Sequence, residues 1–588
     1  MSEIIQLSAM SYGSEAIGRM SSGKTVFVEG GVPGDVVECS ITCEKPSFAR
    51  ACIERIVQPS TYRVATTSQY DKLCGSASWQ HIAYEQQCAL KRSNIIAQLE
   101  RIGKLSPDKA KSVVREMLPS KRVWEYRNKI ELAVHFDRMH GISVGYTNPQ
   151  TGEVVENPMS LLVEPPLQKA ARALQGVLRF SLGKTDYGMH RISMRYSRRT
   201  RSFEVALWCK PGPFPRNFVA KALNDSLHCS SIVRVLSNPQ TPRAIKGIEV
   251  LAGKGYWHEQ LICAGETFDF YTQAPAFFQV NTHQAGCLVQ QVLDALGDID
   301  GARVADLYAG GGTFSIPLAA AGAQVVAVES VGASVRDLRR NALENGVDVD
   351  VCGGDAAREL AALGADGSAY VGTCSGADNA DSSANNANSG VKTAGVLCTA
   401  GAARIAHVAG AARAHAALDA LVVDPPRAGL AASVPADIVK SGAQRMVYVS
   451  CDPATLARDI ARLQDCGMQL ERVQPVDMFP QTFRVETVAL LSHQKLTEYV
   501  QIPYEPEDKT AHAFRDATYK EIKDWIKKVF DMKVSSLYIA QIKDECGLEK
   551  RQNYNKSKKE NAKVPTCTKE KRKAILAALR HFQMIDNE

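Results

Sequence analysis

A thiol and two carboxylates stand in short, distinctive motifs in the second half of the sequence. Cys451 ends an apolar run, Val447-Tyr448-Val449-Ser450, and is followed by Asp452-Pro453, which halts the predicted strand. Asp424 lies upstream of Cys451, directly before Pro425-Pro426, and Glu486 lies downstream of it. This combination suits covalent catalysis on an electron-poor ring, in which a thiolate adds and a base later removes a proton. A lone cysteine is more often a small buried hydrophobe, so the interpretation depends on the surrounding motifs.

A glycine-rich turn upstream indicates a cofactor site. It runs Asp306-Leu307-Tyr308-Ala309-Gly310-Gly311-Gly312-Thr313-Phe314, between a predicted strand and a predicted helix. Glu329 ends the next strand, where a carboxylate accepts hydrogen bonds from ribose hydroxyls. The Lys-Ser/Thr pair of a phosphate-binding loop is missing, so S-adenosylmethionine fits better than ATP. Asp355 ends a third strand, either near an adenine or as an ordinary helix-capping aspartate.

The elements that must position these groups form a parallel α/β sheet. Four apolar strands that end in polar residues are predicted at 304–308, 325–329, 420–424 and 446–450. Strands of this kind are buried on both faces, and ligands bind at their carboxyl ends. We therefore predict an α/β domain over residues 266–494, with a flexible Ala/Gly/Ser-rich insertion at 361–417.

Three further segments differ in pattern from this domain. Residues 1–59 alternate apolar and polar residues between turns, which predicts a small β-barrel. Residues 60–265 include a helix near Ile82–Ile102 and a mostly β middle domain. Residues 495–588 form a basic helical extension, either a nucleic-acid-binding module or a solvated appendage.

The composition is that of an ordinary globular protein. The chain has 588 residues, a net charge of +7 and scattered cysteines, which we expect to be free thiols. We find no apolar membrane span and no signal pattern, so we expect a cytoplasmic protein with no membrane partner. The mild basicity is weak support for a polyanionic partner.

The motifs, taken together and in order, resemble the RNA uracil-C5 methyltransferase family, over about residues 4–492. The resemblance is carried by Phe277-Phe278-Gln279-Val280-Asn281, the turn from Asp306 to Phe314, Asp424-Pro425-Pro426-Arg427, Ser450-Cys451-Asp452-Pro453 and Asp477-Met478-Phe479-Pro480. It is closest to the branch that acts on 23S ribosomal RNA and carries an N-terminal TRAM barrel. It implies a Rossmann-like methyltransferase domain that uses S-adenosylmethionine.

The resemblance also implies roles for individual residues. Cys451 matches the nucleophile that adds to C6 of the uracil, and Glu486 matches the base that removes the C5 proton. The positions that match cofactor contacts are Gln279, Tyr308, Thr313, Glu329, Asp355 and Asp424. The partner implied is RNA, 23S rRNA before tRNA, and we expect a monomer.

Two departures from the family pattern stand out. Many members carry a 4Fe–4S cluster on four cysteines, whereas here Ser68, Ala77 and Asn157 occupy three of the matching positions and only Cys74 remains. Because one thiolate cannot hold the cluster, we predict no iron–sulfur cluster and no metal, and a subdomain held by packing alone. In addition, Arg484 stands where the family usually has His, and we expect its charge to lower the pKa of Glu486.

RNA contacts are expected from the segment that contains Arg122, Tyr126, Arg127 and Lys129, where aromatics alternate with basic residues. A solvated basic strand edge is the alternative for this segment. Three alternatives to methylation of 23S rRNA remain: the same reaction on the tRNA T-loop, an RNA-binding assembly factor without catalysis, and a generic Rossmann oxidoreductase. The intact Cys451, Glu486 and Asp424 favour methylation.

Overall fold

The computed structural model describes residues 2–364, 417–493, 517–532, 534–546, 569–582 and 584–585. Most of the predicted insertion at 361–417 therefore lies outside the described residues. The chain divides into two compact units, Met1–Lys495 and Leu496–Glu588. None of the helices in the described part is both long and apolar enough to cross a membrane.

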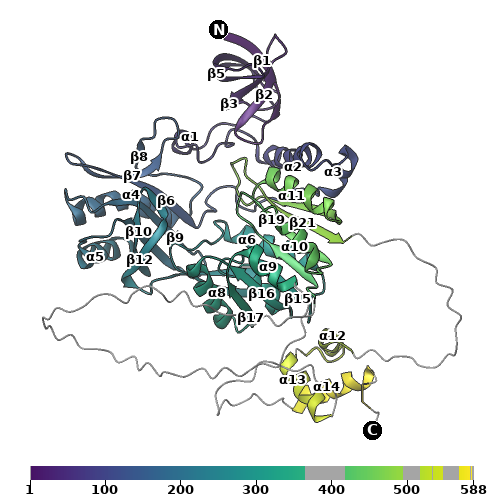
Figure 1. Ribbon diagram of the computed structural model, residues 1–588. Coiled ribbons are helices and arrows are strands. Elements are labelled where there is room, and N and C mark those ends of the chain that lie inside the picture. Colours follow the sequence, from purple (N-terminus) through teal and green to yellow (C-terminus); the bar gives the residue numbers. More distant parts are fainter. Residues whose placement is uncertain are drawn as a thin grey trace, which may run out of the picture. The chain divides into compact units, whose positions relative to one another are not determined.

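The first unit begins with a closed five-stranded barrel (Figure 1). Its strands, paired in the order β1-β2-β3-β5-β4, are β1 (Ser2–Met10), β2 (Glu15–Arg19), β3 (Thr25–Glu29), β4 (Val36–Glu44) and β5 (Phe48–Gln58). Buried and exposed side chains alternate along β2 and β3, as the period of a strand requires. The expected barrel is confirmed.

The segment after the barrel contains α1 (Gln69–Leu73), α2 (Tyr84–Arg101) and α3 (Pro107–Val113). Its first loop is organised by a buried carboxylate, because Asp71 accepts hydrogen bonds from the Leu161 amide, at 2.8 Å, and from the Ser76 hydroxyl. The Gln80 amide group pairs with the backbone of Ser68 through two bonds of 2.8 Å. The expectation of packing alone is therefore wrong, since hydrogen bonds to buried side chains hold this loop as well.

A seven-stranded sheet forms the middle domain, with strand order β12-β11-β10-β9-β6-β7-β8. The strands are β6 (Lys129–Asp137), β7 (Gly141–Thr147), β8 (Val154–Glu156), β9 (Met189–Tyr196), β10 (Phe203–Cys209), β11 (Ser231–Asn238) and β12 (Thr241–Gly253). Two helices that the sequence analysis does not mention, α4 (Pro165–Leu182) and α5 (Arg216–Leu227), share its apolar core.

A second seven-stranded sheet, ordered β17-β16-β15-β18-β19-β21-β20, forms the α/β domain. Its strands are β15 (Arg303–Leu307), β16 (Gln324–Glu329), β17 (Val349–Gly353), β18 (Ala420–Val423), β19 (Arg445–Ser450), β20 (Met468–Val476) and β21 (Glu486–His493). The first five run parallel, and β21 is antiparallel to both neighbours. The chain order reverses between β15 and β18, which is where such sheets bind ligands.

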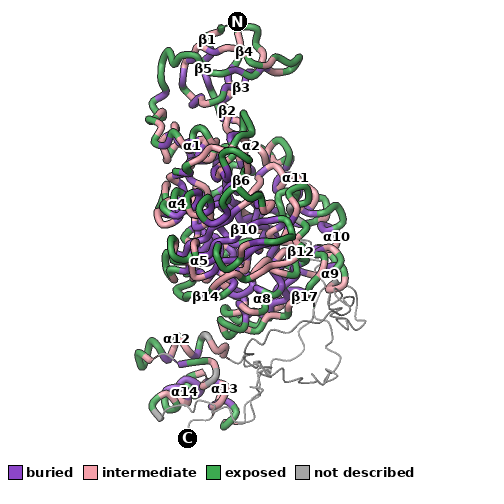
Figure 2. The backbone as a smooth tube through the Cα atoms, turned by 90° about the vertical axis from the view of Figure 1, so that its left-hand side faces the viewer, coloured by how far each residue is buried: buried purple, intermediate pink, exposed green. Residues whose placement is uncertain are grey.

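Helices cover both faces of this sheet and close two large apolar cores. Figure 2 colours the buried residues of the chain purple. The helices are α6 (Thr282–Leu296), α7 (Ser315–Ala320), α8 (Gly332–Glu344), α9 (Ala356–Gly364), α10 (Val434–Lys440) and α11 (Pro453–Asp465). A hairpin of β13 (Trp257–Cys263) and β14 (Glu266–Thr272) leads into α6 and contributes to one core. Ile95 and Leu99 of α2 belong to the other core, so α2 is part of the α/β domain's packing.

A fully buried ion pair fastens α2 to the loop between β20 and β21. Lys91 Nζ lies 2.7 Å from Asp477 Oδ1, and both side chains are 0% exposed. The Tyr84 hydroxyl donates to the other carboxylate oxygen at 2.8 Å, and Lys91 also donates to the Phe479 carbonyl at 3.1 Å. The Asp477-Met478-Phe479-Pro480 motif is thus held from α2.

The second unit is a small helical cluster of α12 (Tyr519–Phe530), α13 (Ser536–Glu545) and α14 (Lys569–His581). Thr518 and Glu521 form a capping box at the start of α12. The helices share an apolar core that includes Ile526, Ile542 and Ile575. The expected helical extension is confirmed.

We predict that Lys91→Met destabilises the protein by about 3–5 kcal/mol, because it leaves the Asp477 carboxylate buried without its cation. Urea unfolding followed by tryptophan fluorescence measures the change, with Lys111→Met, at an exposed position of α3, as the control. An equal midpoint for the two variants would contradict the importance of the buried pair.

Candidate active site

The motifs meet at one edge of the α/β sheet, at the carboxyl ends of three neighbouring parallel strands. β15 leads into the glycine turn, β18 into Asp424 and β19 into Cys451. The Asp424 amide donates to the Leu307 carbonyl at 3.3 Å, which joins the first two of these ends directly. Residues that are distant in the sequence are therefore brought together at one edge of the sheet.

The glycine turn is tied to the end of the next strand. The Gly310 amide donates to Glu329 Oε2 at 2.9 Å, and the Val331 amide donates to Glu329 Oε1 at 2.6 Å. Tyr308 and Gly310 both have positive φ, 65° and 57°, so the backbone turns sharply here. A Cβ at Gly310 would meet no atom within 4 Å, which shows that the turn is open on this side.

Asp306 is a functional candidate that the sequence reasoning does not single out. It is 0% exposed; one carboxyl oxygen accepts from the Ser315 hydroxyl, and Oδ1 is buried without a hydrogen-bond partner. Burial, followed by the nearby Glu329 carboxylate, raises its pKa to about 7. Its position as the last carboxylate before the glycine turn is the signal that would have identified it.

The other cofactor candidates have different surroundings. Gln279 is buried, and its backbone carbonyl oxygen accepts a hydrogen bond from Asn128 Nδ2 at 2.9 Å. Thr313 is half-buried within the turn. Asp355 is exposed and caps α9, because its Oδ1 accepts from the amides of Ala357, at 3.1 Å, and Arg358, at 3.2 Å. The capping alternative for Asp355 is thus present in the structure.

Cys451 is half-buried at the end of β19, directly before α11. Asp452 caps that helix by accepting from the Ala454 and Thr455 amides at 3.0 and 2.9 Å. Burial and the Glu486 carboxylate raise the pKa of the Cys451 thiol to about 11, while a hydrogen bond from Arg427 opposes this change. The free thiol is therefore mostly protonated at neutral pH.

Both carboxylates beside the thiol have a raised pKa, and Asp424 contributes to the increase at Glu486. Burial is the largest cause for both, and it brings the pKa of Asp424 to about 7 with a contribution from Asp306. Glu486 is 5% exposed, and burial and Asp424 raise its pKa well above the usual value. The expectation that Arg484 lowers the pKa of Glu486 is wrong: the net change is upward, and Arg427 is the cation that opposes it.

The barrel reaches this site through the loop between β1 and β2. The Tyr12 hydroxyl donates to Asp452 Oδ2 at 3.3 Å, and its ring meets Phe483 edge-on at 6.1 Å. Trp79 Nε1 donates to the Gly13 carbonyl at 3.1 Å, which anchors the same loop. One aromatic side chain of the barrel thus contacts both the loop after Cys451 and the loop before Glu486.

The expected RNA contacts of the 121–129 segment are only partly accessible. Tyr126 is 3% exposed and its hydroxyl donates to the Pro480 carbonyl at 3.1 Å, so it supports the fold and does not stack on bases. Lys129 pairs with Glu131 at 2.7 Å. Arg122 is exposed and Arg127 is half-buried, which leaves these two as candidates.

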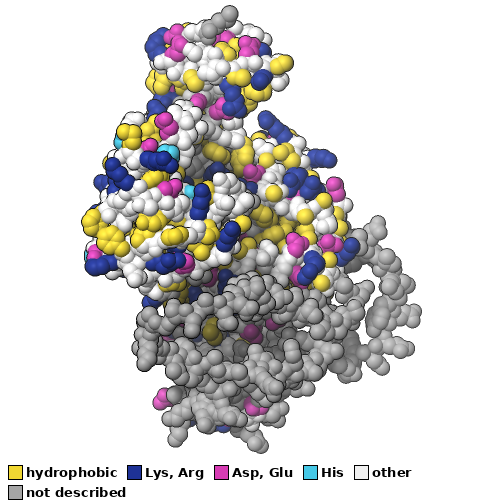
Figure 3. Space-filling view, turned by 60° about the vertical axis from the view of Figure 1, so that its left-hand side comes forward, with side chains coloured by type: hydrophobic (Ala, Val, Ile, Leu, Met, Phe, Trp, Pro, Cys, Tyr) yellow, Lys and Arg dark blue, Asp and Glu magenta, His cyan; other side chains and the backbone are white. Residues whose placement is uncertain are grey.

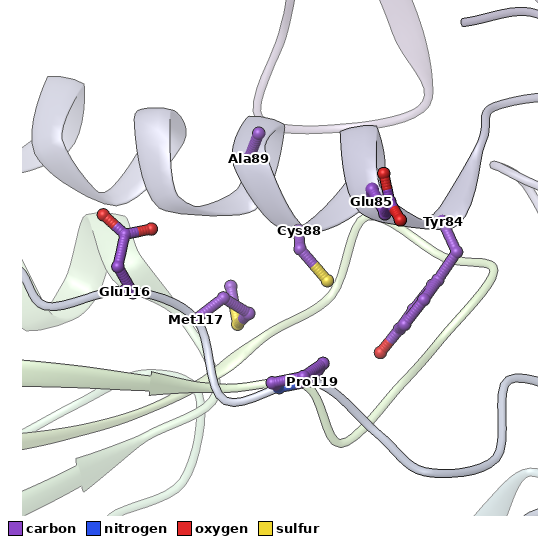
Figure 4. A pocket seen from close by; sticks show the side chains of 7 residues that line it. All are labelled: Tyr84, Glu85, Cys88, Ala89, Glu116, Met117 and Pro119. Carbon is purple, nitrogen blue, oxygen red and sulfur yellow. The ribbon is translucent and has the colours of Figure 1, made fainter.

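A pocket of about 340 Å³ lies between α2 and the chain at 116–119 (Figure 4). Cys88 points from α2 toward Met117 and Pro119, and the lining also contains Glu85 and Glu116. None of the site candidates lines it. The carboxylates of Glu85 and Glu116 make the pocket unsuited to a polyanion such as RNA. The pocket is therefore distinct from the candidate active site.

Comparisons with known proteins agree with this geometry. A sequence profile described as tRNA (Uracil-5-)-methyltransferase matches residues 221–360 and 402–494, and a TRAM domain profile matches residues 5–53. An uncharacterized RNA methyltransferase of Thermosynechococcus vestitus is 31% identical over 498 residues, which are 83% of this chain and 97% of that protein. The chain belongs to the RNA (uracil-C5)-methyltransferase family. It is an enzyme family that depends on S-adenosylmethionine.

Two further relatives differ in the RNA that their names specify. The 23S rRNA (uracil(1939)-C(5))-methyltransferase RlmD of Azoarcus sp. is 30% identical over 476 residues, 80% of this chain and 94% of that protein. The crystal structure of Pyrococcus abyssi tRNA (uracil-54, C5)-methyltransferase with S-adenosyl-L-homocysteine is 21% identical. It matches with a TM-score of 0.58 over 83% of this chain and 99% of that chain, a likeness of fold.

The iron–sulfur cluster of many family members does not fit the residues present. Ser68 caps α1 by accepting from the Asp71 amide, at 3.1 Å, and Ala77 packs in an apolar cluster with Tyr126. Within the described ranges, no group of His, Cys, Asp or Glu side chains is arranged to hold a metal ion. The one remaining thiol, Cys74, is insufficient for a cluster that needs four.

We predict that alkylation of Cys451 by iodoacetamide is slow at pH 8 and rises about tenfold per pH unit, with a plateau near the thiol pKa of about 11. Arg427→Gln should slow it further at pH 8, because the hydrogen bond that favours the thiolate is lost. Mass spectrometry of the Cys451 peptide measures the rate, with Cys451→Ala to assign the peptide. A plateau below pH 9 would contradict the surroundings described for the thiol.

Proposed function

We propose that the enzyme methylates a uridine of 23S rRNA at C5, through a covalent bond between Cys451 Sγ and C6 of the uracil. The observation that carries the proposal is the meeting of Cys451, Glu486 and Asp424 in one crevice beside the glycine turn. Glu486 and Asp424 both raise the pKa of the Cys451 thiol, so the three groups are close enough to interact electrostatically.

The reaction divides between these side chains. The Cys451 thiolate adds to C6, and the electron pair of the C5–C6 double bond moves toward C5 and the O4 carbonyl, so that C5 becomes nucleophilic. Bound S-adenosylmethionine supplies an electrophilic methyl group to C5. The Glu486 carboxylate then takes the C5 proton, the double bond re-forms, and the Cys451 thiolate leaves. A raised pKa makes Glu486 a stronger base for this step.

Asp424 is proposed to lie between the uracil and the cofactor. Its carboxyl has a pKa of about 7, so near neutral pH it exists partly in the protonated form, which donates a hydrogen bond to a carbonyl oxygen. We assign the cofactor to Gln279, Tyr308, Thr313, Glu329, Asp355 and Asp424. Glu329 is suited to ribose hydroxyls, and the open backbone at Gly310 admits the ligand closely.

The choice of 23S rRNA rests on two features. The TRAM barrel is present and its Tyr12 contacts the nucleophile's loop. Two relatives, from Azoarcus sp. and Neisseria lactamica, are 30% and 27% identical and are named as methyltransferases of 23S rRNA. The tRNA T-loop is the second candidate, since the structure from Pyrococcus abyssi has the same fold and a tRNA substrate. We propose a monomer that acts in the cytoplasm.

RNA binding is proposed to involve the barrel and the body beneath it. Figure 3 shows Lys and Arg side chains recurring over both parts on one face of the molecule. Such groups bind phosphates and fix the RNA, while the target uridine leaves its stack to reach Cys451. The proposed domains are those of the sequence analysis: residues 1–59, 60–265, 266–494 and 495–588.

Tritium transfer from methyl-labelled S-adenosylmethionine tests the substrate. We expect label on unmodified 23S rRNA that digests to 5-methyluridine and is abolished by Cys451→Ala. Glu486→Gln should slow turnover by about 10²–10⁴-fold, because the base is lost. Glu486→Gln should also accumulate a covalent protein–RNA complex that survives denaturation, because the adduct forms but the C5 proton is not removed to release Cys451.

Each other outcome has a distinct meaning. Label on tRNA alone would retain the chemistry and overturn the choice of substrate. No label on either RNA, with binding intact, would favour a binding protein without catalysis. Arg339→Gln, at an exposed position on α8, is the matched control and should be unchanged.

A further inference from the structure

Arg484 is a half-buried cation without an anionic partner among the described residues. It lies in the loop before β21, two residues ahead of Glu486, where its guanidinium lies 5.2 Å from the centre of the Phe483 ring. No carboxylate in the described part of the chain forms an ion pair with it, unlike Arg198 and Arg63, which pair with Glu164 and Asp35. Partial burial of an unpaired charge is unfavourable, so an anion from outside the chain is the natural complement.

The charged neighbours of Arg484 are arginines, and the groups that act in the opposite direction on its pKa are Tyr12 and Cys451, two weak acids whose own pKa values are raised. Arg427 and Arg127 both act on Arg484, and burial and then Arg427 lower its pKa. Arg427 already donates a hydrogen bond to Cys451 Sγ. The nearby Glu486 has a pKa raised well above the usual value, which reduces its negative charge. Arg427 and Arg127 are therefore close enough to Arg484 to act on its charge, and Arg427 also acts on Cys451.

The position of Arg484 separates it from the cofactor turn. That turn follows β15, whereas Arg484 precedes β21, and β18 and β19 lie between these two strands. On its own side, Arg484 adjoins Phe483, whose ring meets Tyr12 of the barrel. The barrel side is where RNA is expected to enter.

We propose that Arg484, flanked by Arg427 and Arg127, forms an anion site at the mouth of the active site that binds a phosphate of the RNA strand beside the target uridine. The planar guanidinium presents paired N–H donors that match two phosphate oxygens. A uridine whose C6 lies at Cys451 brings its own backbone phosphates to the rim of the same crevice. The proposal rests on the proposed function for RNA as the substrate, and it assigns Arg484 to binding.

The salt dependence of RNA binding tests this assignment. The full chain is titrated onto unmodified 23S rRNA over a range of KCl concentrations, without S-adenosylmethionine, for the wild type, Arg484→Gln and Arg484→Lys. Loss of one phosphate contact should reduce the slope of log Kd against log salt by about 0.7–0.9 and weaken binding by about tenfold near 0.1 M salt. Arg484→Lys keeps the charge and should retain the slope, and Arg339→Gln on α8 should match the wild type.

Two further readouts distinguish the other anions that Arg484 would suit. If its partner were the carboxylate of S-adenosylmethionine, Arg484→Gln would raise the KM for the cofactor and leave RNA binding unchanged. If its partner were the Cys451 thiolate, the pH profile of Cys451 alkylation would shift. Either result would overturn the proposal, and so would an unchanged slope in Arg484→Gln. Failure of the proposed function would appear separately, as a wild type that binds RNA but transfers no methyl group.

Discussion

The buried pair of Lys91 and Asp477 is the interaction on which the geometry of the site depends. Asp477 receives Lys91 and the Tyr84 hydroxyl from α2, and the Gln284 side chain of α6 donates to its carbonyl at 3.2 Å. The loop that starts at Asp477 leads directly to Glu486 at the start of β21. The loop before Glu486 is therefore held by a helix that lies almost 400 residues earlier in the chain. Because Lys91 and Asp477 are both fully buried, the loss of either side chain would leave the other as an unpaired buried charge, which is strongly destabilising.

Burial of ionisable groups also determines the acid–base properties of the candidate active site. Burial raises the pKa of Asp306, Asp424, Glu486 and Cys451, and Arg427 acts in the opposite direction on the last two. These four groups therefore hold their protons to a higher pH than they would in water.

The sequence predicted much of this architecture. The parallel sheet was identified from apolar runs that end in polar residues. A sheet with helices on both faces requires nearly continuous apolar strands, and β15, β16, β18 and β19 have this pattern. The glycine turn, Cys451 and Glu486 were found because their motifs lie at strand ends. The contacts of Lys91 and Tyr12 were not predictable, since they join residues separated by several hundred positions. The burial of Tyr126 was missed because alternation of aromatic and basic residues describes an RNA-binding edge and a core strand equally well.

A direct test of the account is to locate the covalent bond. An RNA fragment of the substrate in which 5-fluorouridine replaces the target uridine has no C5 proton for Glu486 to remove, so the adduct should persist. The account predicts that mass spectrometry of the digested complex finds the nucleotide on the Cys451 peptide, and that Cys451→Ala forms no complex. Attachment to another cysteine, or a methylated product without any adduct, would contradict the central claim.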